Sequence, residues 1–221
     1  MTRPWLDQYP AGVPHDVTPE RYRSLSALLE ESFKQHAREP VSVCMEQWMS
    51  YGELDGLSAA LGAWLQGRGL VPGARVAIML PNVPQFLITM AAVVRAGYTV
   101  VNVNPLYTAR ELEHQLKDSG ATAIVILENF AATLQDVIER TAVQHVALAS
   151  IGDLLGPING RWLSFAVRHL AKMVPPFELP LSAGRSVTPF NKAIAQVRGM
   201  NLRPTAQSMD DIAFLQYTGG T

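Results

Sequence analysis

Short apolar runs of strand length alternate with segments of helical period along this chain from residue 41 onward. Strands of a parallel sheet are buried on both faces and appear as continuous apolar runs, and a crossover helix must join each to the next. The alternation therefore predicts an α/β fold, a mostly parallel sheet flanked by helices. Expected strands cover 41–47, 75–80, 99–104, 121–127, 145–151 and 212–217, and expected helices lie near 22–38, 51–66, 83–96, 109–119 and 130–140.

Two of the expected helices carry signals for where they begin. Ser50 precedes the 51–66 helix and Glu53 stands three residues further on, the spacing of a capping box, in which each residue satisfies a free amide of the other. Thr108 and Glu111 repeat this spacing ahead of the 109–119 helix. Within 51–66, one stripe recurs at helical spacing, formed by Leu54, Leu57, Ser58, Leu61 and Leu65.

The regular alternation stops between residues 152 and 209, where glycine and proline interrupt two short helix candidates. We expect residues 1–40 to form an N-terminal arm and first helix, and residues 41–221 to form one α/β subdomain. Within it, 152–209 is expected to be an excursion from the sheet. Residues 154–209 hold seven basic residues and one acidic residue, a net charge of +6, whereas the whole chain carries −1. The overall charge argues against general nucleic-acid binding, and the excursion is locally basic.

Composition places the chain among ordinary soluble proteins, with 48% hydrophobic and 17% charged residues. The longest uncharged apolar stretch, 86–94, is shorter than the roughly 20 residues that cross a bilayer, and the N-terminus lacks a signal-peptide pattern. The single cysteine, Cys44, is expected to be a thiol of the core. No histidine or cysteine cluster has metal-ligand spacing, so we assign no metal ligands. These features predict a cytoplasmic protein.

A basic, partly apolar helix is expected in the sequence RWLSFAVRHLAKMV, which begins at Arg161. Its polar stripe holds Arg161, Ser164, Arg168 and Lys172, and its broad apolar face holds Trp162, Phe165, Leu170 and Met173. Such a helix suits an anionic membrane surface. We therefore take Arg161, Trp162, Phe165, Arg168 and Lys172 as candidates for peripheral contact with the inner face of the cell membrane. The alternative is a helix that packs on its own protein with its charges solvated.

The sequence DIAFLQYTGGT at 211–221 predicts a strand followed directly by a glycine-rich turn. In a parallel sheet the carboxyl end of a strand is where ligand loops lie. Successive glycines let backbone amides point inward around an anion, and threonine hydroxyls add donors. Gly-Gly is also common in turns for conformational reasons alone, so these residues by themselves leave both interpretations open.

The wider sequence resembles a known superfamily. The segment YTGGT is similar to the opening of the phosphate loop of adenylate-forming enzymes, and the stretch from MSYGELDGL to ATAIVI is similar to their N-terminal subdomain. Three stretches, VVNVNPLYTARELEHQL, TAVQHV and DIAFLQYTGGT, resemble bacterial long-chain fatty-acid CoA ligases. The resemblance implies that Tyr217, Thr218, Gly219, Gly220 and Thr221 bind the phosphates of ATP, with Tyr217 flanking the loop.

What the resemblance implies for function is a two-step reaction that uses ATP, Mg²⁺ and CoA. A long-chain fatty acid attacks ATP to give acyl-adenylate and pyrophosphate, and CoA then displaces AMP. This chain resembles only the N-terminal part of such an enzyme and stops before the loop lysine. We therefore expect a fragment that is inactive alone, contains no catalytic residue and binds none of these cofactors by itself.

Two alternative functions and the oligomeric state stay open at this point. One is an adenylate-forming ligase for another carboxylic acid, since the residues that shape the acyl pocket lie mostly beyond the sequence. Another is a non-catalytic module that binds a nucleotide or a membrane. The oligomeric state is open as well, because an exposed sheet edge or apolar patch can pair two copies into a homodimer.

Overall fold

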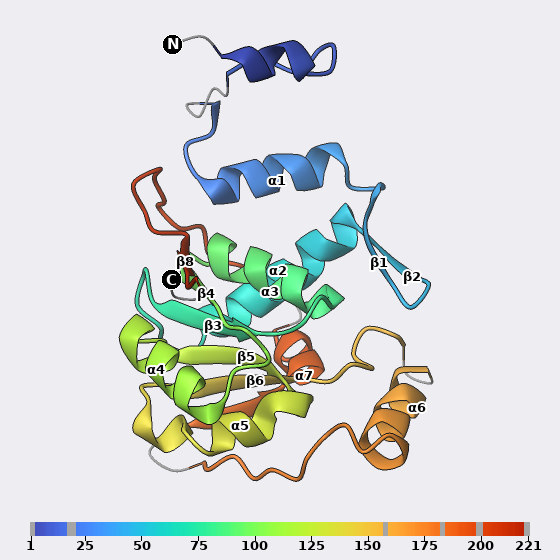
Figure 1. The fold of residues 1–221 in the computed structure, drawn as a ribbon, viewed down its shortest axis with the longest axis vertical. Coiled ribbons are helices and arrows are strands. Elements are labelled where there is room, and N and C mark those ends of the chain that lie inside the picture. Colours follow the sequence, from blue (N-terminus) through green and yellow to red (C-terminus); the bar gives the residue numbers. More distant parts are fainter. Residues whose placement is uncertain (1–2, 17–20, 157–158, 182–183, 198–200, 219–221) are drawn as a thin grey trace.

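The computed structural model describes residues 3–16, 21–156, 159–181, 184–197 and 201–218. Its centre is a six-stranded sheet in the order β7-β6-β5-β3-β4-β8, and all neighbouring strands run parallel. This confirms the predicted α/β class with a mostly parallel sheet (Figure 1). The strands are β3 (Arg75–Met79), β4 (Thr99–Asn102), β5 (Ala123–Leu127), β6 (His145–Ala149), β7 (Ser186–Pro189) and β8 (Phe214–Gln216).

Helices cover both faces of this sheet. Successive strand residues point to opposite faces, so Val76 and Ile78 pack in one layer while Ala77 and Met79 pack in the other. All four side chains are buried, which explains why the strand sequence is apolar without alternation. The first layer contains α2 (Tyr51–Gln66), α3 (Pro84–Arg95) and α7 (Phe190–Ala195), and the second contains α4 (Ala109–Ser119) and α5 (Ala131–Gln135).

Both predicted capping boxes are present. The Ser50 hydroxyl accepts a 3.2 Å hydrogen bond from the Glu53 amide, and the Glu53 carboxylate accepts a 2.8 Å bond from the Ser50 amide at the start of α2. Thr108 and Glu111 form the same pair at the start of α4. The local sequence thus fixes where both helices begin, independently of the sheet.

The single strand expected at 41–47 is instead a hairpin of β1 (Pro40–Cys44) and β2 (Gln47–Ser50), paired antiparallel. Met45 and Glu46 form the turn with φ of 47° and 63°, the left-handed conformation that two-residue hairpins require. Turn signals such as Asn-Gly are missing here, so the pattern gave no sign of a break. Cys44, expected in the core, lies at the end of β1 and is partly exposed.

The helix expected at 130–140 is broken into three short pieces. These are the 3-10 turns η3 (Glu128–Phe130) and η4 (Ile138–Arg140) on either side of α5. The α-helical conformation stops at Val137, which has φ −125° and ψ −20°. Both Val137 and Ile138 are buried in the layer under α4, and the break lets these adjacent residues point into that core together.

The excursion was expected to stay outside the sheet, and this is wrong for its second half. The strand β7 pairs in parallel with β6 and forms one edge of the sheet, and α7 follows it directly. This strand has four residues and ends in Pro189, features that argue for a loop in sequence but are tolerated at an edge.

The first half of the excursion contains α6 (Asn159–Phe165), which continues directly into a π-helical turn, η5 (Ala166–Leu170). The start of α6 lies against the turn after β6, where Gly152 and Gly160 pack backbone to backbone. A side chain on either glycine would overlap the carbonyl oxygen of the other. Figure 1 shows α6 at one side of the molecule, apart from the helices that cover the sheet.

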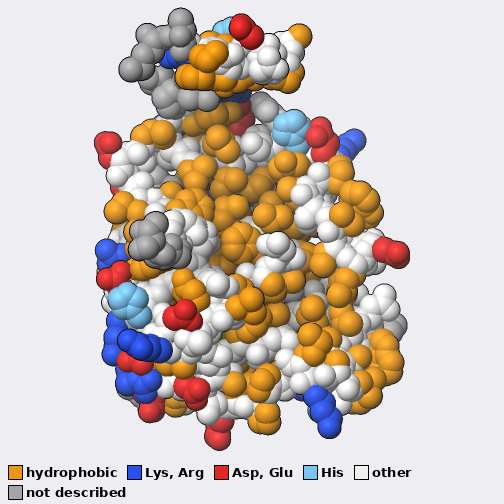
Figure 2. Space-filling view, in the orientation of Figure 1, with side chains coloured by type: hydrophobic (Ala, Val, Ile, Leu, Met, Phe, Trp, Pro, Cys, Tyr) orange, Lys and Arg blue, Asp and Glu red, His pale blue; other side chains and the backbone are white. Residues whose placement is uncertain are grey.

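The N-terminal part contains a 3-10 turn, η1 (Pro4–Gln8), and α1 (Leu25–Gln35). The Ser24 hydroxyl caps α1 by accepting a hydrogen bond from the Ala27 amide. The face in Figure 2 carries hydrophobic side chains over its upper middle, where Figure 1 draws α1, α2 and α3. A large exposed apolar area on a protein surface marks contact with further polypeptide, a ligand or a membrane.

Candidate functional site

The predicted phosphate loop begins at the carboxyl end of β8. This strand pairs with β4, with Gln216 opposite Asn102, and Tyr217 and Thr218 follow it directly. Because all strands of the sheet are parallel, this end coincides with the carboxyl ends of β3 and β4, where α/β proteins bind ligands. The other three predicted residues, Gly219, Gly220 and Thr221, lie outside the described residues.

Tyr217 points away from the loop and toward α4. Its phenol donates a 2.5 Å hydrogen bond to the Asp118 carboxylate in the last turn of α4, and its ring packs in the layer beneath that helix. Burial, followed by the hydrogen bond to Asp118, raises the pKa of Tyr217 to about 12. The phenol therefore keeps its proton and uses it to hold Asp118.

A second polar contact joins β8 to its neighbour on the other face of the sheet. The Asn102 side-chain amide donates a 2.8 Å hydrogen bond to the Gln216 side-chain oxygen. The carbonyl of Asn102 accepts a 2.7 Å hydrogen bond from the Gln115 side chain on α4. Sequence reasoning missed Asn102, Gln216 and Asp118, because the partners stand 99 or 114 positions apart and no local pattern links them.

Further along the same end of the sheet, a buried polar network holds α6 and η5. Glu128, immediately after β5, has a side chain that is 3% exposed and forms an ion pair with Arg168 of η5. The Ser150 hydroxyl, just after β6, donates a 2.9 Å hydrogen bond to Glu128. The hydroxyls of Ser150 and Ser164 lie 2.8 Å apart. Two residues of the predicted polar stripe, Ser164 and Arg168, thus face the protein.

Asp153 extends this network toward α3 and α7. Its carboxylate accepts hydrogen bonds from the Ser150 amide at 2.8 Å and from the Asn191 side chain at 2.7 Å. Burial raises the pKa of Asp153 to about 6, the Ser150 amide opposes this rise, and the nearby charge of Glu128 adds to it. Gln85, at the start of α3, donates to the carbonyl oxygens of Ser150 and Asp153. The network therefore connects the ends of β5 and β6 with three helices.

The apolar side of α6 and η5 points outward. Trp162 is 64% exposed and Phe165 49%, and their rings stack with centroids 6.0 Å apart. Leu170 and Met173 are also exposed. Of the basic membrane-contact candidates, Arg161 and Lys172 are exposed, whereas Arg168 is engaged by Glu128. We call the outward-facing set Trp162, Phe165, Leu170 and Met173 the α6 apolar face.

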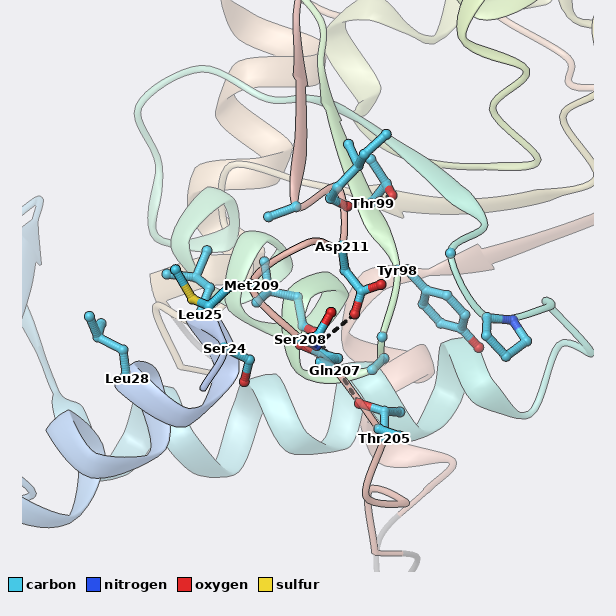
Figure 3. A pocket seen from close by; sticks show the side chains of 18 of the residues that line it. Ser24, Leu25, Leu28, Tyr98, Thr99, Thr205, Gln207, Ser208, Met209 and Asp211 are labelled. Carbon is cyan, nitrogen blue, oxygen red and sulfur yellow. Dashed lines mark hydrogen bonds between the residues drawn. The ribbon is translucent and has the colours of Figure 1, made fainter. Parts of the chain in front are cut away.

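A large cavity lies at the other end of the sheet. It has a volume of about 1420 Å³ and extends past the first residues of β3 and β4, Arg75 and Thr99. Figure 3 shows Ser24, Leu25 and Leu28 on one side of it and the segment from Thr205 to Asp211 on another. Hydrogen bonds within that segment join the Ser208 amide to Asp211 and the Gln207 side chain to Thr205. Of the described residues that follow β8, neither Tyr217 nor Thr218 lines this cavity.

Residues 3–16, 21–156, 159–181, 184–197 and 201–218 contain neither a membrane-spanning helix nor a metal-ligand cluster. Within these ranges, no helix combines the length and the apolar character needed to cross a membrane. No group of three or more histidine, cysteine, aspartate or glutamate side chains in the described part of the chain is arranged to hold a metal ion.

Comparison with known proteins assigns a family to this arrangement. The model of the family described as AMP-binding enzyme matches residues 29–221. Long-chain-fatty-acid--CoA ligase of Escherichia coli O157:H7 is 45% identical over 222 residues, which cover all of this chain and 39% of that protein. The ligase of the same name from Bacillus subtilis is 31% identical over 99% of this chain and 38% of its own length. The chain spans about two fifths of the curated relatives it matches.

Solved structures of low sequence identity share the fold. A long-chain-fatty-acid-CoA ligase from Archaeoglobus fulgidus matches with a TM-score of 0.67 at 21% identity, over 97% of this chain and 37% of that one. An anthranilate CoA ligase in complex with anthranoyl-AMP matches with a TM-score of 0.68 at 19% identity, over 90% of this chain and 33% of that one. Since the family model covers most of the sequence, the chain belongs to the AMP-binding enzyme family.

Proposed function

We propose that this chain is the N-terminal part of a long-chain fatty-acid CoA ligase, which joins a fatty acid to CoA at the expense of ATP. The observation that carries the proposal is 45% identity to the E. coli ligase along the entire chain. The reaction proceeds through an acyl-adenylate, with release of pyrophosphate, before CoA displaces AMP. In this proposal the chain supplies one wall of the active site.

The physical task of the first step is to bring two anions together. A carboxylate approaches the triphosphate of ATP only where positive charge and hydrogen-bond donors offset the repulsion. The residues after β8 are suited to this task, because glycine amides and threonine hydroxyls donate to phosphate oxygens. We assign this role to Thr218, Gly219, Gly220 and Thr221, and we revise the role of Tyr217, whose phenol already donates to Asp118.

Mg²⁺ and CoA belong to the proposed reaction but not to an assigned site in this chain. The described residues contain no carboxylate or histidine cluster for a metal. The hydroxyl of Thr218 is an oxygen ligand of the kind Mg²⁺ accepts, and it follows β8 directly. When bound with ATP, Mg²⁺ would neutralise charge on the phosphates.

The test compares two proteins. The first, called the long protein, extends this sequence to the full length of its relatives, and the second is residues 1–221 alone. Pyrophosphate release without CoA reports adenylate formation, and thioester formation with CoA reports the complete reaction. We expect both activities with long-chain acids in the long protein and neither in residues 1–221. Thr218→Ala should raise the KM for ATP, whereas Thr141→Ala, between η4 and β6, should leave it unchanged. Thioester formation with aromatic or short acids only would support the alternative of another carboxylic acid.

The α6 apolar face supports a second proposed function, peripheral contact with an anionic membrane. The face presents Trp162 and Phe165 to solvent and is flanked by exposed Arg161 and Lys172. Aromatic side chains insert at the headgroup boundary, and each nearby basic residue adds about 1 kcal/mol on an anionic surface. The +6 charge of residues 154–209 favours the same surface. Such contact would let the enzyme collect fatty acids from the bilayer.

Vesicle sedimentation tests this contact. Trp162→Ala with Phe165→Ala, and separately Arg161→Glu with Lys172→Glu, should each weaken binding to anionic vesicles. Trp48→Ala and Arg110→Glu are matched controls, because Trp48 is 68% exposed on the β1–β2 hairpin and Arg110 is exposed on α4. Arg168 is left unchanged, since its substitution would also leave the Glu128 carboxylate without its ion-pair partner. Equal binding by all variants would exclude this face as the membrane contact.

A further inference from the structure

We infer that Asp118 is a positioning residue for the phosphate loop, because it holds Tyr217 and so fixes the direction in which the chain leaves β8. The inference rests on the proposed function of the residues that follow Tyr217. It adds a residue that no sequence pattern selected, located in the last turn of α4.

We call the hydrogen bond between Tyr217 and Asp118 the anchor. Such a contact is needed because of where β8 lies in the sheet. The strand has three residues and forms the edge of the sheet, so within the described part of the chain only β4 pairs with it. Phe214 and Gln216 are exposed and Leu215 is only partly buried. A strand with so few ladder hydrogen bonds and so little burial holds its register weakly. Side-chain contacts must therefore contribute to the position of the residues that come next.

Two such side-chain contacts hold β8, one on each face of the sheet. Gln216 points to one face and accepts a hydrogen bond from Asn102, its partner in register. Tyr217 points to the other face and donates to Asp118. Of the two, the Tyr217 contact is closest to the loop, since Thr218 is the next residue. Its acceptor is a carboxylate, and hydrogen bonds to charged groups are the stronger class.

The same contact determines what Tyr217 does not do. Its phenol has one proton, and that proton is directed to Asp118. Tyr217 therefore acts on the phosphates through the position of the backbone and not through its hydroxyl. Misplacing a binding group by about 1 Å can cost a factor of about 100 in rate. Loss of the anchor, the contact between Tyr217 and Asp118, should thus change the kinetic constants for ATP more than those for fatty acid or CoA.

The experiment measures steady-state kinetics of the protein at the length of its relatives, with KM determined separately for ATP, fatty acid and CoA. Tyr217→Phe and Asp118→Ala should each raise the KM for ATP roughly tenfold, the range of a lost hydrogen bond to a charged group. The double variant should show no further rise, because either change alone removes the contact. Asp118→Asn keeps an acceptor oxygen and should recover most of the affinity.

Tyr107→Phe is the matched control. Tyr107 packs in the same layer as Tyr217, and within the described residues its hydroxyl has no hydrogen bond to another side chain or carbonyl. Three results would each contradict the inference that Asp118 positions the loop. They are an unchanged KM for ATP in Tyr217→Phe and Asp118→Ala, additive effects in the double variant, and equal rises in KM for all three substrates. A long protein with no ATP-dependent activity on any acid would instead overturn the proposed function, and the inference with it.

Discussion

Arg168 forms an ion pair with Glu128, and this contact joins the π-helical turn η5 to the carboxyl end of β5. The Glu128 side chain is 3% exposed and that of Arg168 is 49% exposed. A buried carboxylate needs a charged partner, so the pair fixes which side of the helix faces the protein. It thereby turns the α6 apolar face outward. Irregular π-helical turns of this kind are frequent at functional sites.

Removal of Arg168 should loosen this helix. Arg168→Ala leaves Glu128 buried without its partner and should lower the free energy of unfolding by about 2 kcal/mol, less than the roughly 3 to 5 kcal/mol of a fully buried pair. Hydrogen exchange of residues 159–170 should rise more than that of β5. Arg161→Ala, on the exposed side of the same helix, is the control and should change neither quantity. Equal protection in the two variants would contradict a structural role for the pair.

Asp153 predicts a pH dependence of stability. Its pKa is raised from 3.8 to about 6 in the folded protein, mainly by burial. Between these pH values the folded state holds a proton that the unfolded state has released, so this group's contribution to stability falls as pH rises. Asp153→Asn does not titrate and should gain about 2 kcal/mol relative to the original protein between pH 4 and pH 7. Urea unfolding at a series of pH values measures the difference. The prediction would be refuted if the free energies of unfolding of Asp153→Asn and the original protein differed by the same amount at every pH.

Alanine substitution should lower the stability of the protein at Gly152 and raise it at Gly56. In Gly152→Ala the new methyl group overlaps the Gly160 carbonyl, so the start of α6 must move and the protein should lose roughly 1 to 3 kcal/mol of stability. In Gly56→Ala the methyl group meets no atom within 4 Å on the surface of α2. There alanine should add about 0.5 to 1 kcal/mol because it favours the helix. Thermal unfolding of both variants tests whether stability falls in Gly152→Ala and rises in Gly56→Ala.

The capping box of α2 should contribute to stability without touching the proposed site. Ser50→Ala removes the acceptor for the Glu53 amide and should cost about 1 kcal/mol, whereas Ser50→Thr keeps the hydroxyl and most of the stability. In the long protein, the KM for ATP should be the same in both variants. A change in KM for ATP would mean that α2 influences the loop after β8.

Local sequence determined the parts of the fold that depend on near neighbours. The capping residues Ser50 and Thr108 set the starts of α2 and α4, and continuous apolar runs gave β3, β4, β5 and β6. The hairpin turn at Met45 and Glu46 and the edge strand β7 escaped prediction. Their residues carry no turn or strand signal, and they adopt these conformations because β1 pairs with β2 and β7 pairs with β6.

For the site, the sequence by itself determined the family and predicted a phosphate loop after a strand. Motif and spacing are local properties, and they do not depend on which way a side chain points. Only the tertiary structure decided that Tyr217 binds Asp118, that Arg168 faces Glu128 and that the α6 apolar face is exposed. These two contacts join residues 40 and 99 positions apart, and they form because the fold packs η5 and α4 against residues that follow strands distant from them in the sequence.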